Sequence, residues 1–293
     1  MRYKKLTALD NVGFTLKENV ICGVLGRNGA GKTTLLSLLA AFRRPTAGTI
    51  RVLGENPYEN PRVMPQIAFI YDKSKENSVK SGIVFKYAFD VKDILRQHAC
   101  FRPNWDNFYA QRLCKRFDIP LTKDLRSLSR GQQAAIRVII GLAGRAPVTI
   151  FDEAHLGMDA VYRKLFISEI LDDYMQHPRM ILFSTHHIDE VDKLFSEVII
   201  LDNGRIAAHE DCDSLRQKGV VVTGNIADVD FFTQGRQTLF ERSLGTQKEK
   251  VLFGALTETE RAAAEGAGLV LSAPSLQDLF IYMTEKGGRN YED

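Results

Sequence analysis

The sequence contains little cysteine and carries little net charge. Only four of its 293 residues are cysteines, at positions 22, 100, 114 and 212, and their spacing matches no zinc-binding pattern. We therefore expect the reduced thiols of a cytosolic protein rather than a metal module or a disulfide scaffold. The formal net charge is only +3 and no dense basic run occurs, so no nucleic-acid partner is expected.

Long apolar runs are also missing. No segment reaches the roughly 18 uninterrupted apolar residues that span a bilayer, and the best candidate, "AAIRVIIGLAG", is interrupted by Arg137. The first residues, "MRYKK", lack the apolar region of a signal peptide, so none is expected. The length, with 44% hydrophobic and 26% charged residues, predicts a globular protein with one large and one small domain.

What the sequence does contain is a glycine-rich stretch between two apolar segments, "GVLGRNGAGKTTLLSLLAAF". Residues 20–25 predict a strand, and leucines at helical spacing predict a helix over residues 33–42. Between them, Gly26-x-x-x-x-Gly31-Lys32-Thr33 is the Walker A pattern in its strand–loop–helix context. Glycines such as Gly29 let successive N–H groups point inward, Lys32 adds a positive charge, and the Thr33 hydroxyl can reach a magnesium ion. We expect a triphosphate site here; the alternative is an ordinary glycine-rich turn before a helix.

Strands and helices alternate through the first two thirds of the chain. Strands are expected over residues 6–16, 48–56, 66–71, 148–153 and 180–187, followed by a hairpin that turns at Asn203-Gly204. Apolar residues at helical intervals predict a helical insertion over about residues 73–135, with a break at "FRPNWDN". This alternation predicts a mainly parallel sheet that is covered by helices on both faces.

The last part of the chain has a different pattern. Four short apolar runs, "GVVVTG", "RQTLFERS", "EKVLFG" and "LVLS", are separated by two helical segments near residues 226–232 and 258–267. The order βαββαβ predicts a small ferredoxin-like domain over residues 213–293, after a main domain over residues 1–212. An irregular extension packed on the main domain is the alternative.

Four further stretches follow the glycine-rich loop in a fixed order: "LSRGQQ", "VTIFDE", "AHLGMDA" and "FSTHH". Each alone is a weak signal. A serine before a helix is usually an N-cap, paired carboxylates at a strand end are often solvated, and a single histidine is more often structural than catalytic. Together, in this order behind a Walker A loop, they are not a coincidence.

Over about residues 1–210 the chain resembles the nucleotide-binding subunit of an ATP-binding cassette (ABC) transporter. "LSRGQ" is similar to the family signature, "IFDE" to Walker B with its catalytic glutamate, "LGMD" to the D-loop and "STH" to the H-loop. The resemblance implies a P-loop ABC ATPase domain, with a mixed, mainly parallel sheet and a helical subdomain, plus a small α+β C-terminal domain. The tail is similar to that of drug- and peptide-exporting members that have a separate permease subunit.

The resemblance also implies a role for each site residue. Glu153 would polarise the attacking water and His186 would contact the γ-phosphate, while Mg²⁺ would be held by Thr33, Asp152 and Asp72. ATP would be bound by Tyr3, which stacks on adenine, and by Gly26, Asn28, Gly29, Ala30, Gly31, Lys32, Thr33, Thr34, Asp72, Ser129, Gly131, Gln132 and Asp159. The signature residues would meet ATP held by a second subunit, either an identical copy or a paralogue.

Three positions depart from the family pattern. Asp72 stands where the family usually has glutamine, which puts the coupling at that position in doubt. Arg130 replaces the first glycine of the signature, where it would either add charge near the phosphates or point to solvent. Ala154-His155 replaces the usual Pro-Thr or Pro-Ser after the glutamate, and we interpret His155 as a packing or loop residue, with a role in a dimer interface left open.

The leading hypothesis is an ATPase subunit of an exporter, located in the cytoplasm and held on the inner face of the membrane by its permease. The amphipathic segment 84–95 is expected to receive that permease. A soluble ABC ATPase that acts on ribosomes or DNA and a nucleotide-gated regulator are the alternatives. The single cassette and the absence of sustained heptads disfavour the first of these.

Overall fold

A computed structural model describes residues 1–4, 6–71, 89–186 and 188–284. Asp72, which the sequence analysis places near the magnesium ion, lies outside the described residues. So does the first part of the predicted docking segment, residues 84–88.

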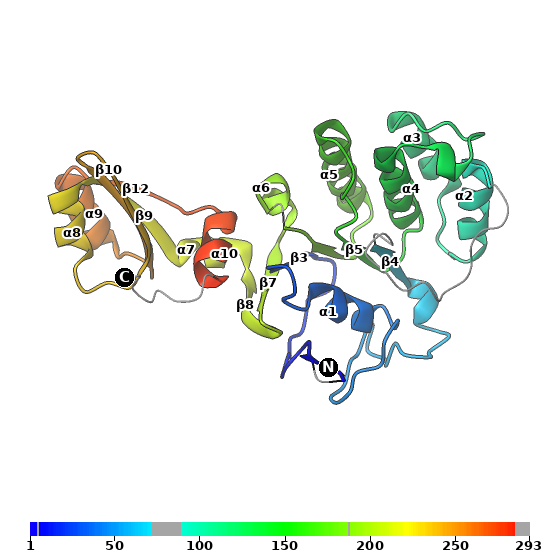
Figure 1. Ribbon diagram of the computed structural model, residues 1–293, viewed down its shortest axis with the longest axis horizontal. Helices are drawn as coiled ribbons and strands as arrows, with labels where there is room; N and C mark the ends of the chain where they lie inside the picture. The colour runs from blue at the N-terminus through cyan, green and yellow to red at the C-terminus, as the bar shows by residue number, and fades with distance from the viewer. Residues whose placement is uncertain (5, 72–88, 187, 285–293) are drawn as a thin grey trace.

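A six-stranded sheet forms the centre of the molecule (Figure 1). Its strand order is β4 (Ile67–Tyr71), β5 (Val148–Asp152), β6 (Met180–Ser184), β3 (Ile21–Gly26), β7 (Glu197–Asp202) and β8 (Arg205–Asp211). The first five strands are parallel, and β8 returns antiparallel to β7 through a turn at Asn203 and Gly204, both with positive φ. The predictions of a mainly parallel sheet and of this hairpin are confirmed.

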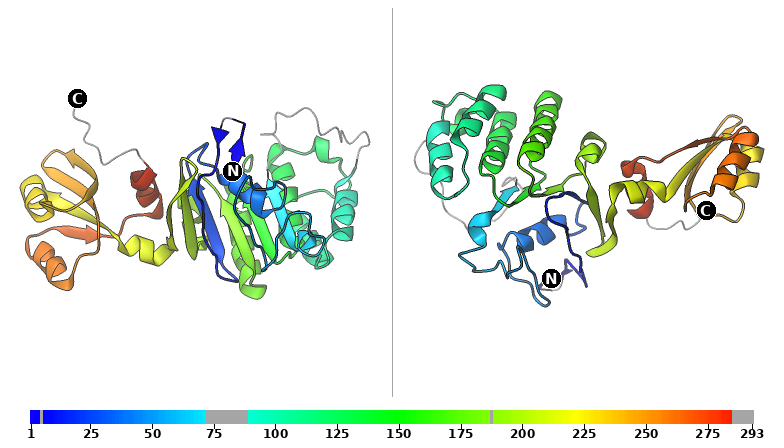
Figure 2. Two further views of the ribbon diagram at one scale, coloured as in Figure 1. Left: turned by 90° about the horizontal axis from the view of Figure 1, so that it is seen from below. Right: turned by 180° about the vertical axis from the view of Figure 1, so that it is seen from behind.

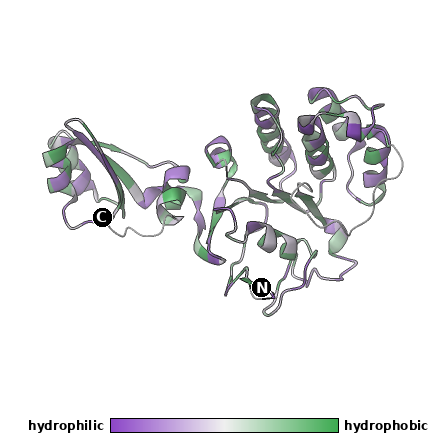
Figure 3. Ribbon diagram, in the orientation of Figure 1, coloured by the Kyte–Doolittle hydropathy of each residue, from purple (hydrophilic) through white to green (hydrophobic). Residues whose placement is uncertain are grey.

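Helices cover both faces of this sheet, as Figure 1 shows. Helix α1 (Lys32–Leu39) lies on one face, and α4 (Arg130–Ala143), α5 (Ala160–Gln176) and α6 (Ile188–Val191) lie on the other. Neighbouring strand residues point to opposite faces: Ile150 joins the core cluster of α1, whereas Phe151 joins the cluster of α4 and α5. Because both faces are buried, the inner strands are mostly apolar and appear largely green in Figure 3, whereas the edge strand β8 carries several polar residues.

The helical segment consists of α2 (Val91–Cys100), α3 (Asn107–Arg116) and the start of α4. Asp90 and Asp106 cap α2 and α3 by accepting hydrogen bonds from main-chain N–H groups. Val91 and Leu95 of α2 are buried in the main core. Val91 and Leu95 therefore offer no exposed apolar surface, and the docking of a permease on the segment 84–95 stays a prediction.

A second sheet forms near the end of the chain. Its order is β10 (Thr238–Leu244), β11 (Gln247–Phe253), β9 (Gly219–Asn225) and β12 (Val270–Ser272), and every pair is antiparallel. Helices α8 (Ile226–Thr233) and α9 (Glu258–Gly266) join these strands and share a small core with them. The chain therefore ends in an α+β unit; its limits as a domain, at residues 213 and 293, stay a prediction.

Two helices lie between the sheets, α7 (Cys212–Gln217) and α10 (Leu276–Thr284), as Figure 2 shows for α10. Leu215, Leu276 and Leu279 are fully buried and belong to the main core cluster. On its other side α10 meets the second sheet, because Tyr282 stacks on Phe240 with ring centroids 4.9 Å apart. Helix α10 therefore contacts both the cassette and the tail.

Two predicted strands are much shorter than expected. In residues 6–16 only β2 (Leu6–Thr7) forms, paired with β1 (Arg2–Tyr3), because the chain then turns at Asn11, which has positive φ. In residues 48–56 the backbone makes a single bridge, Val52 to Glu55, around a tight turn. The remaining elements are short 3₁₀ turns at Met64–Gln66, Leu125–Ser127 and Asp192–Leu194.

The cysteines are not joined by disulfides, and three of the four are buried. Burial raises the pKa of the Cys114 thiol to about 11 and that of Cys212 to about 12. These thiols stay protonated and unreactive near neutral pH. Among the described residues, no helix combines the length and the apolar character that crossing a bilayer requires.

Candidate nucleotide-binding site

The glycine-rich loop leaves the end of β3 and enters α1, and two of its glycines are required by geometry. Gly31 has φ 106°, and a Cβ there would lie 2.8 Å from the Ala8 carbonyl oxygen. A Cβ at Gly26 would lie 2.8 Å from the Leu201 carbonyl oxygen. Side chains are therefore excluded at these positions, and the backbone of the loop can close tightly.

Lys32 folds back over this loop. Its side chain is buried, and its Nζ donates hydrogen bonds to the carbonyl oxygens of Gly26, at 2.5 Å, and Arg27, at 3.2 Å. No side chain caps the N-terminus of α1, where Gly31 occupies the cap position. A helix start with a lysine beside it and no side-chain cap has N–H groups and charge available for an anion.

The other predicted loop residues surround the same turn. Asn28, Gly29 and Thr33 are exposed, and Thr34 is half-buried. Ala30 is buried and holds the loop against the β7–β8 hairpin, because its carbonyl oxygen accepts a hydrogen bond from the Gly204 N–H at 3.1 Å. The loop is thus fixed at its base and open on the side of Asn28 and Gly29.

The Walker B carboxylates lie at the same sheet edge. Because β5, β6 and β3 are parallel neighbours, Asp152 stands beside Ser184, and Ser184 stands beside Val24 of β3. Asp152 is buried, and its Oδ1 accepts a hydrogen bond from the Ser184 hydroxyl at 2.5 Å. This carboxylate is thereby held in one orientation.

Glu153 follows in a strained backbone conformation, with φ 50°. Its N–H donates to the Ser184 carbonyl oxygen at 3.2 Å and lies 3.1 Å from the Ser184 hydroxyl. Its side chain is buried, and its Oε1 lies 3.4 Å from Nδ1 of His186, whose side chain is 40% exposed. The structure therefore brings Asp152, Glu153 and His186 together, as the sequence analysis predicts.

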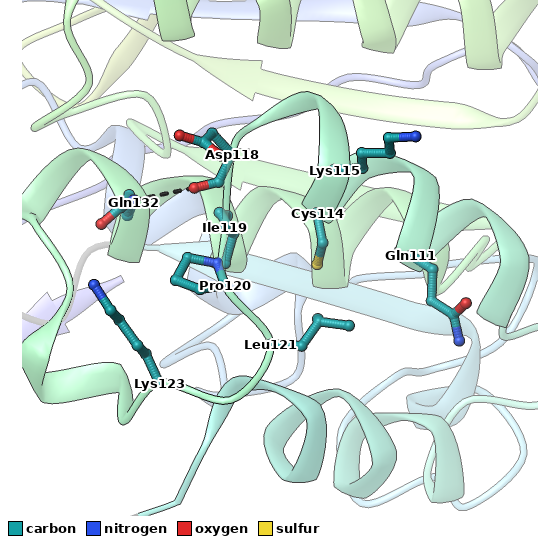
Figure 4. A pocket seen from close by; sticks show the side chains of 9 residues that line it. All are labelled: Gln111, Cys114, Lys115, Asp118, Ile119, Pro120, Leu121, Lys123 and Gln132. Atoms are coloured by element: carbon teal, nitrogen blue, oxygen red, sulfur yellow. Dashed lines mark hydrogen bonds between the residues drawn. The ribbon is translucent and has the colours of Figure 1, made fainter.

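The signature residues form the start of α4. Ser129 and Gln132 make a complete capping box, with each side chain bonded to the other residue's N–H at 3.1 Å. Gln132 also donates to the Asp118 carbonyl oxygen at 3.2 Å, at the rim of a cavity of about 460 Å³ (Figure 4). A Cβ at Gly131 would lie 3.3 Å from the Gly157 carbonyl oxygen, so the signature packs beside the D-loop stretch.

Two of the predicted nucleotide-binding residues, Asp159 and Tyr3, lie away from the sheet edge that carries Asp152. Asp159 is exposed and caps α5 by accepting a hydrogen bond from the Tyr162 N–H at 2.8 Å. Tyr3 lies on β1, and the Arg43 guanidinium covers its ring at 5.2 Å. Neither contact conflicts with a role toward a nucleotide held by the loop or by a second subunit.

Two residues outside the predicted site, Ser184 and Thr185, support it, together with His155, which we interpret from the sequence as a packing or loop residue. The Ser184 hydroxyl donates a hydrogen bond to the Asp152 carboxylate and lies 3.1 Å from the Glu153 N–H. Thr185 and His155 are both buried, and the Thr185 hydroxyl lies 3.3 Å from Nε2 of His155. The motif "FSTHH" contained Ser184 and Thr185, but the register of Ser184 opposite Asp152 emerges only once the strands pair.

The comparisons with known proteins agree with this geometry. The family model described as "ABC transporter" matches residues 9–155, half of the chain. The chain belongs to the ABC transporter family. It is 28% identical over 215 residues to the ABC transporter ATP-binding protein YtrB of Bacillus subtilis (strain 168), covering 73% of this chain and 70% of YtrB. It is 30% identical to the Nod factor export ATP-binding protein I of Ralstonia nicotianae, covering 100% of this chain and 92% of that protein.

The fold is similar to solved ABC cassettes. A structure titled "Structure of ATP binding subunit of ABC transporter" superimposes with a TM-score of 0.61 at 23% identity, covering 73% of this chain and 88% of that one. The predicted family and fold class are therefore confirmed. As an ABC ATP-binding protein, this chain binds ATP and is an ATPase.

Proposed function

We propose that this ABC protein is the ATP-hydrolysing subunit of an exporter and drives a separate membrane permease. The observation that carries the chemistry is the convergence of Lys32, Asp152, Glu153 and His186 at the ends of neighbouring parallel strands. Export is supported by the Ralstonia relative, whose name describes an export ATP-binding protein and which matches along the whole chain.

Each group has a distinct task in phosphoryl transfer, which asks for positioning and charge neutralisation. Lys32 and the N–H groups of residues 28–34 hold the β- and γ-phosphates. Glu153 accepts a proton from the attacking water, and His186, 3.4 Å from it, contacts the γ-phosphate. Glu153 suits this role because its carboxylate is buried and lies beside His186.

The residues present also fit a magnesium ion that enters with ATP. Thr33 offers an exposed hydroxyl and Asp152 a fixed carboxylate, both hard oxygen ligands. No cluster of three or more His, Cys, Asp or Glu side chains capable of holding a metal occurs in the described part of the chain. That suits Mg²⁺, because this ion keeps several waters and takes the remaining ligands from phosphates. It would neutralise charge on the transferred phosphoryl group.

The second half of the ATP site comes from another subunit in this proposal. Ser129 and Gly131 begin α4, whose N-terminus is a second anion-binding end. The described side-chain hydrogen bonds of Ser129 and Gln132 join these two residues to each other and Gln132 to the Asp118 carbonyl oxygen, and none of them reaches the phosphate loop. We infer that this end meets ATP held by a partner cassette, either an identical copy or a paralogue.

Two variants test the chemistry. Glu153→Gln keeps the shape and removes the charge, so ATP should still bind while hydrolysis falls by about 10²–10⁴-fold. An ATP-stabilised dimer should then accumulate and be visible by gel filtration. Lys32→Ala should instead weaken ATP binding itself, measured by titration calorimetry with MgATP.

The contrast between these variants decides the assignment. Near-normal turnover by the Glu153 variant would remove that residue from the catalytic role. Failure to find an ATP-stabilised dimer, with a permease or a paralogue supplied, would count against the two-subunit site.

A further inference from the structure

His155 occupies an unusual place for a residue of the turn after Walker B. Its side chain is 3% exposed, and its ring stacks on Phe183 of β6 with centroids 5.7 Å apart and planes at 17°. The turn that carries it is closed by two main-chain bonds, from the Leu156 N–H to the Glu153 carbonyl and from the Met158 N–H to the His155 carbonyl. A buried imidazole in a closed turn has a fixed position and direction.

That direction is toward the strand end that leads to His186. The Nε2 of His155 lies 3.3 Å from the hydroxyl of Thr185, which is fully buried. The next residue is His186, whose ring centroid lies 6.5 Å from that of His155. The His155 imidazole therefore links the segment that follows Glu153 to the residue that precedes His186.

The same two chain segments that the His155–Thr185 hydrogen bond joins are also joined by contacts of Glu153. The Glu153 N–H bonds to the Ser184 carbonyl, and the Glu153 carboxylate faces His186 at 3.4 Å. The hydrogen bond between His155 and Thr185 joins the same two chain segments. A bond in this position helps to fix the separation of the two segments, which stacking of His155 on Phe183 does not do through Thr185.

We propose that His155 is a positioning residue for ATP hydrolysis: through the Thr185 hydroxyl it holds His186 in register with Glu153. The inference rests on the proposed roles of Glu153 and His186 and adds a residue to them. It assigns His155 a function inside its own subunit, which its burial favours over contact with a partner cassette.

Three variants separate this role from simple packing. His155→Phe retains the stacking on Phe183 and removes the hydrogen bond. His155→Gln retains a hydrogen-bonding group near the Nε2 position and removes the ring. Thr185→Val keeps the shape of the partner side chain and removes its hydroxyl.

The positioning role predicts a definite pattern in steady-state hydrolysis of MgATP. The kcat of His155→Phe and of Thr185→Val should each fall about tenfold, with KM and the Kd for MgATP changing less than about twofold. His155→Gln should recover most of the lost kcat. The double variant His155→Phe/Thr185→Val should be no slower than either single variant, because one bond is removed in all three.

The opposite pattern would overturn the proposal. If His155→Phe keeps full kcat and His155→Gln loses it, the ring acts by packing alone. Thermal unfolding of each variant, measured with and without MgATP, shows whether a loss of rate merely follows a loss of folded protein. Strictly additive losses in the double variant would also contradict a shared bond.

The Glu153→Gln variant separates this inference from the function on which it rests. If Glu153→Gln hydrolyses ATP normally, the assignment of the site fails and the position of His186 no longer matters. If Glu153→Gln is inactive while all His155 variants hydrolyse ATP normally, the site stands and only the role of His155 is wrong.

Discussion

At the scale of single residues, the loop depends on two different constraints at its glycines. Gly29 has φ 85° and open space where a Cβ would stand, so only backbone strain opposes a side chain. Gly31 has φ 106°, and a Cβ added there would also lie less than 3 Å from the Ala8 carbonyl oxygen and from a Leu9 methyl group. The sequence pattern does not distinguish the two glycines, but the tertiary structure leaves space for a Cβ only at Gly29.

We therefore expect Gly31→Ala to be more damaging than Gly29→Ala. The Gly29 variant should lower the free energy of unfolding by about 1–2 kcal/mol through strain. The Gly31 variant should lower the free energy of unfolding by more, because backbone atoms at Ala8 must also move. Urea unfolding without nucleotide measures both, and an equal loss would show that the contact with Ala8 is relieved at no cost.

At the scale of elements, α10 behaves as a part of the main core although it lies in the predicted C-terminal domain. Leu276 and Leu279 are fully buried in the main core cluster. A Cβ added at Gly219, the first residue of β9, would lie 2.5 Å from Pro274 and 2.8 Å from Leu279, so the start of the second sheet packs closely on this segment. The helix thus stabilises the cassette and anchors the tail.

Leu279→Ala should consequently destabilise the protein by about 2–5 kcal/mol, the cost of a cavity in a packed core. Leu244→Ala is the matched control, because Leu244 of β10 is 86% exposed and its loss should change the free energy of unfolding by less than about 0.5 kcal/mol. Chemical denaturation of the full chain gives both values. A Leu279 variant as stable as the control would show that α10 is dispensable for the cassette.

At the scale of the whole molecule, the proposed permease-docking surface has to lie elsewhere than on Val91 and Leu95, which are buried. The described part of the helical segment exposes two aromatic side chains, Phe101 after α2 and Phe108 in α3, at 77% and 79%. Exposed aromatic residues are typical anchors of protein interfaces. We propose that they contribute to permease docking.

The double variant Phe101→Asp/Phe108→Asp should then detach the protein from membranes and leave MgATP affinity unchanged. Phe231→Asp is the control, since Phe231 of α8 is 84% exposed but belongs to the tail. Co-purification from detergent-solubilised membranes of the source cells measures the association. Undiminished recovery of the permease with the double variant would exclude these side chains from the interface.

The order of motifs along the chain was enough to predict the family, and the alternation of strands and helices was enough to predict the parallel sheet; the roles of the single site residues stay predictions. Those features are local: a glycine loop between a strand and a helix, and carboxylates that end a buried strand, each depend on neighbouring residues. The hairpin at Asn203-Gly204 was predictable for the same reason, because two residues with positive φ specify its turn.

Only the tertiary structure decided which side of an element meets which neighbour. The amphipathic pattern of residues 91–95 could not tell a core-facing helix from a partner-facing one, since both bury an apolar stripe. The β-like residues 8–16 did not pair, because a strand needs a partner at the right distance as well as suitable residues. His155 gained its bond to Thr185 because strand pairing sets β6 beside β5, and this contact joins residues thirty positions apart.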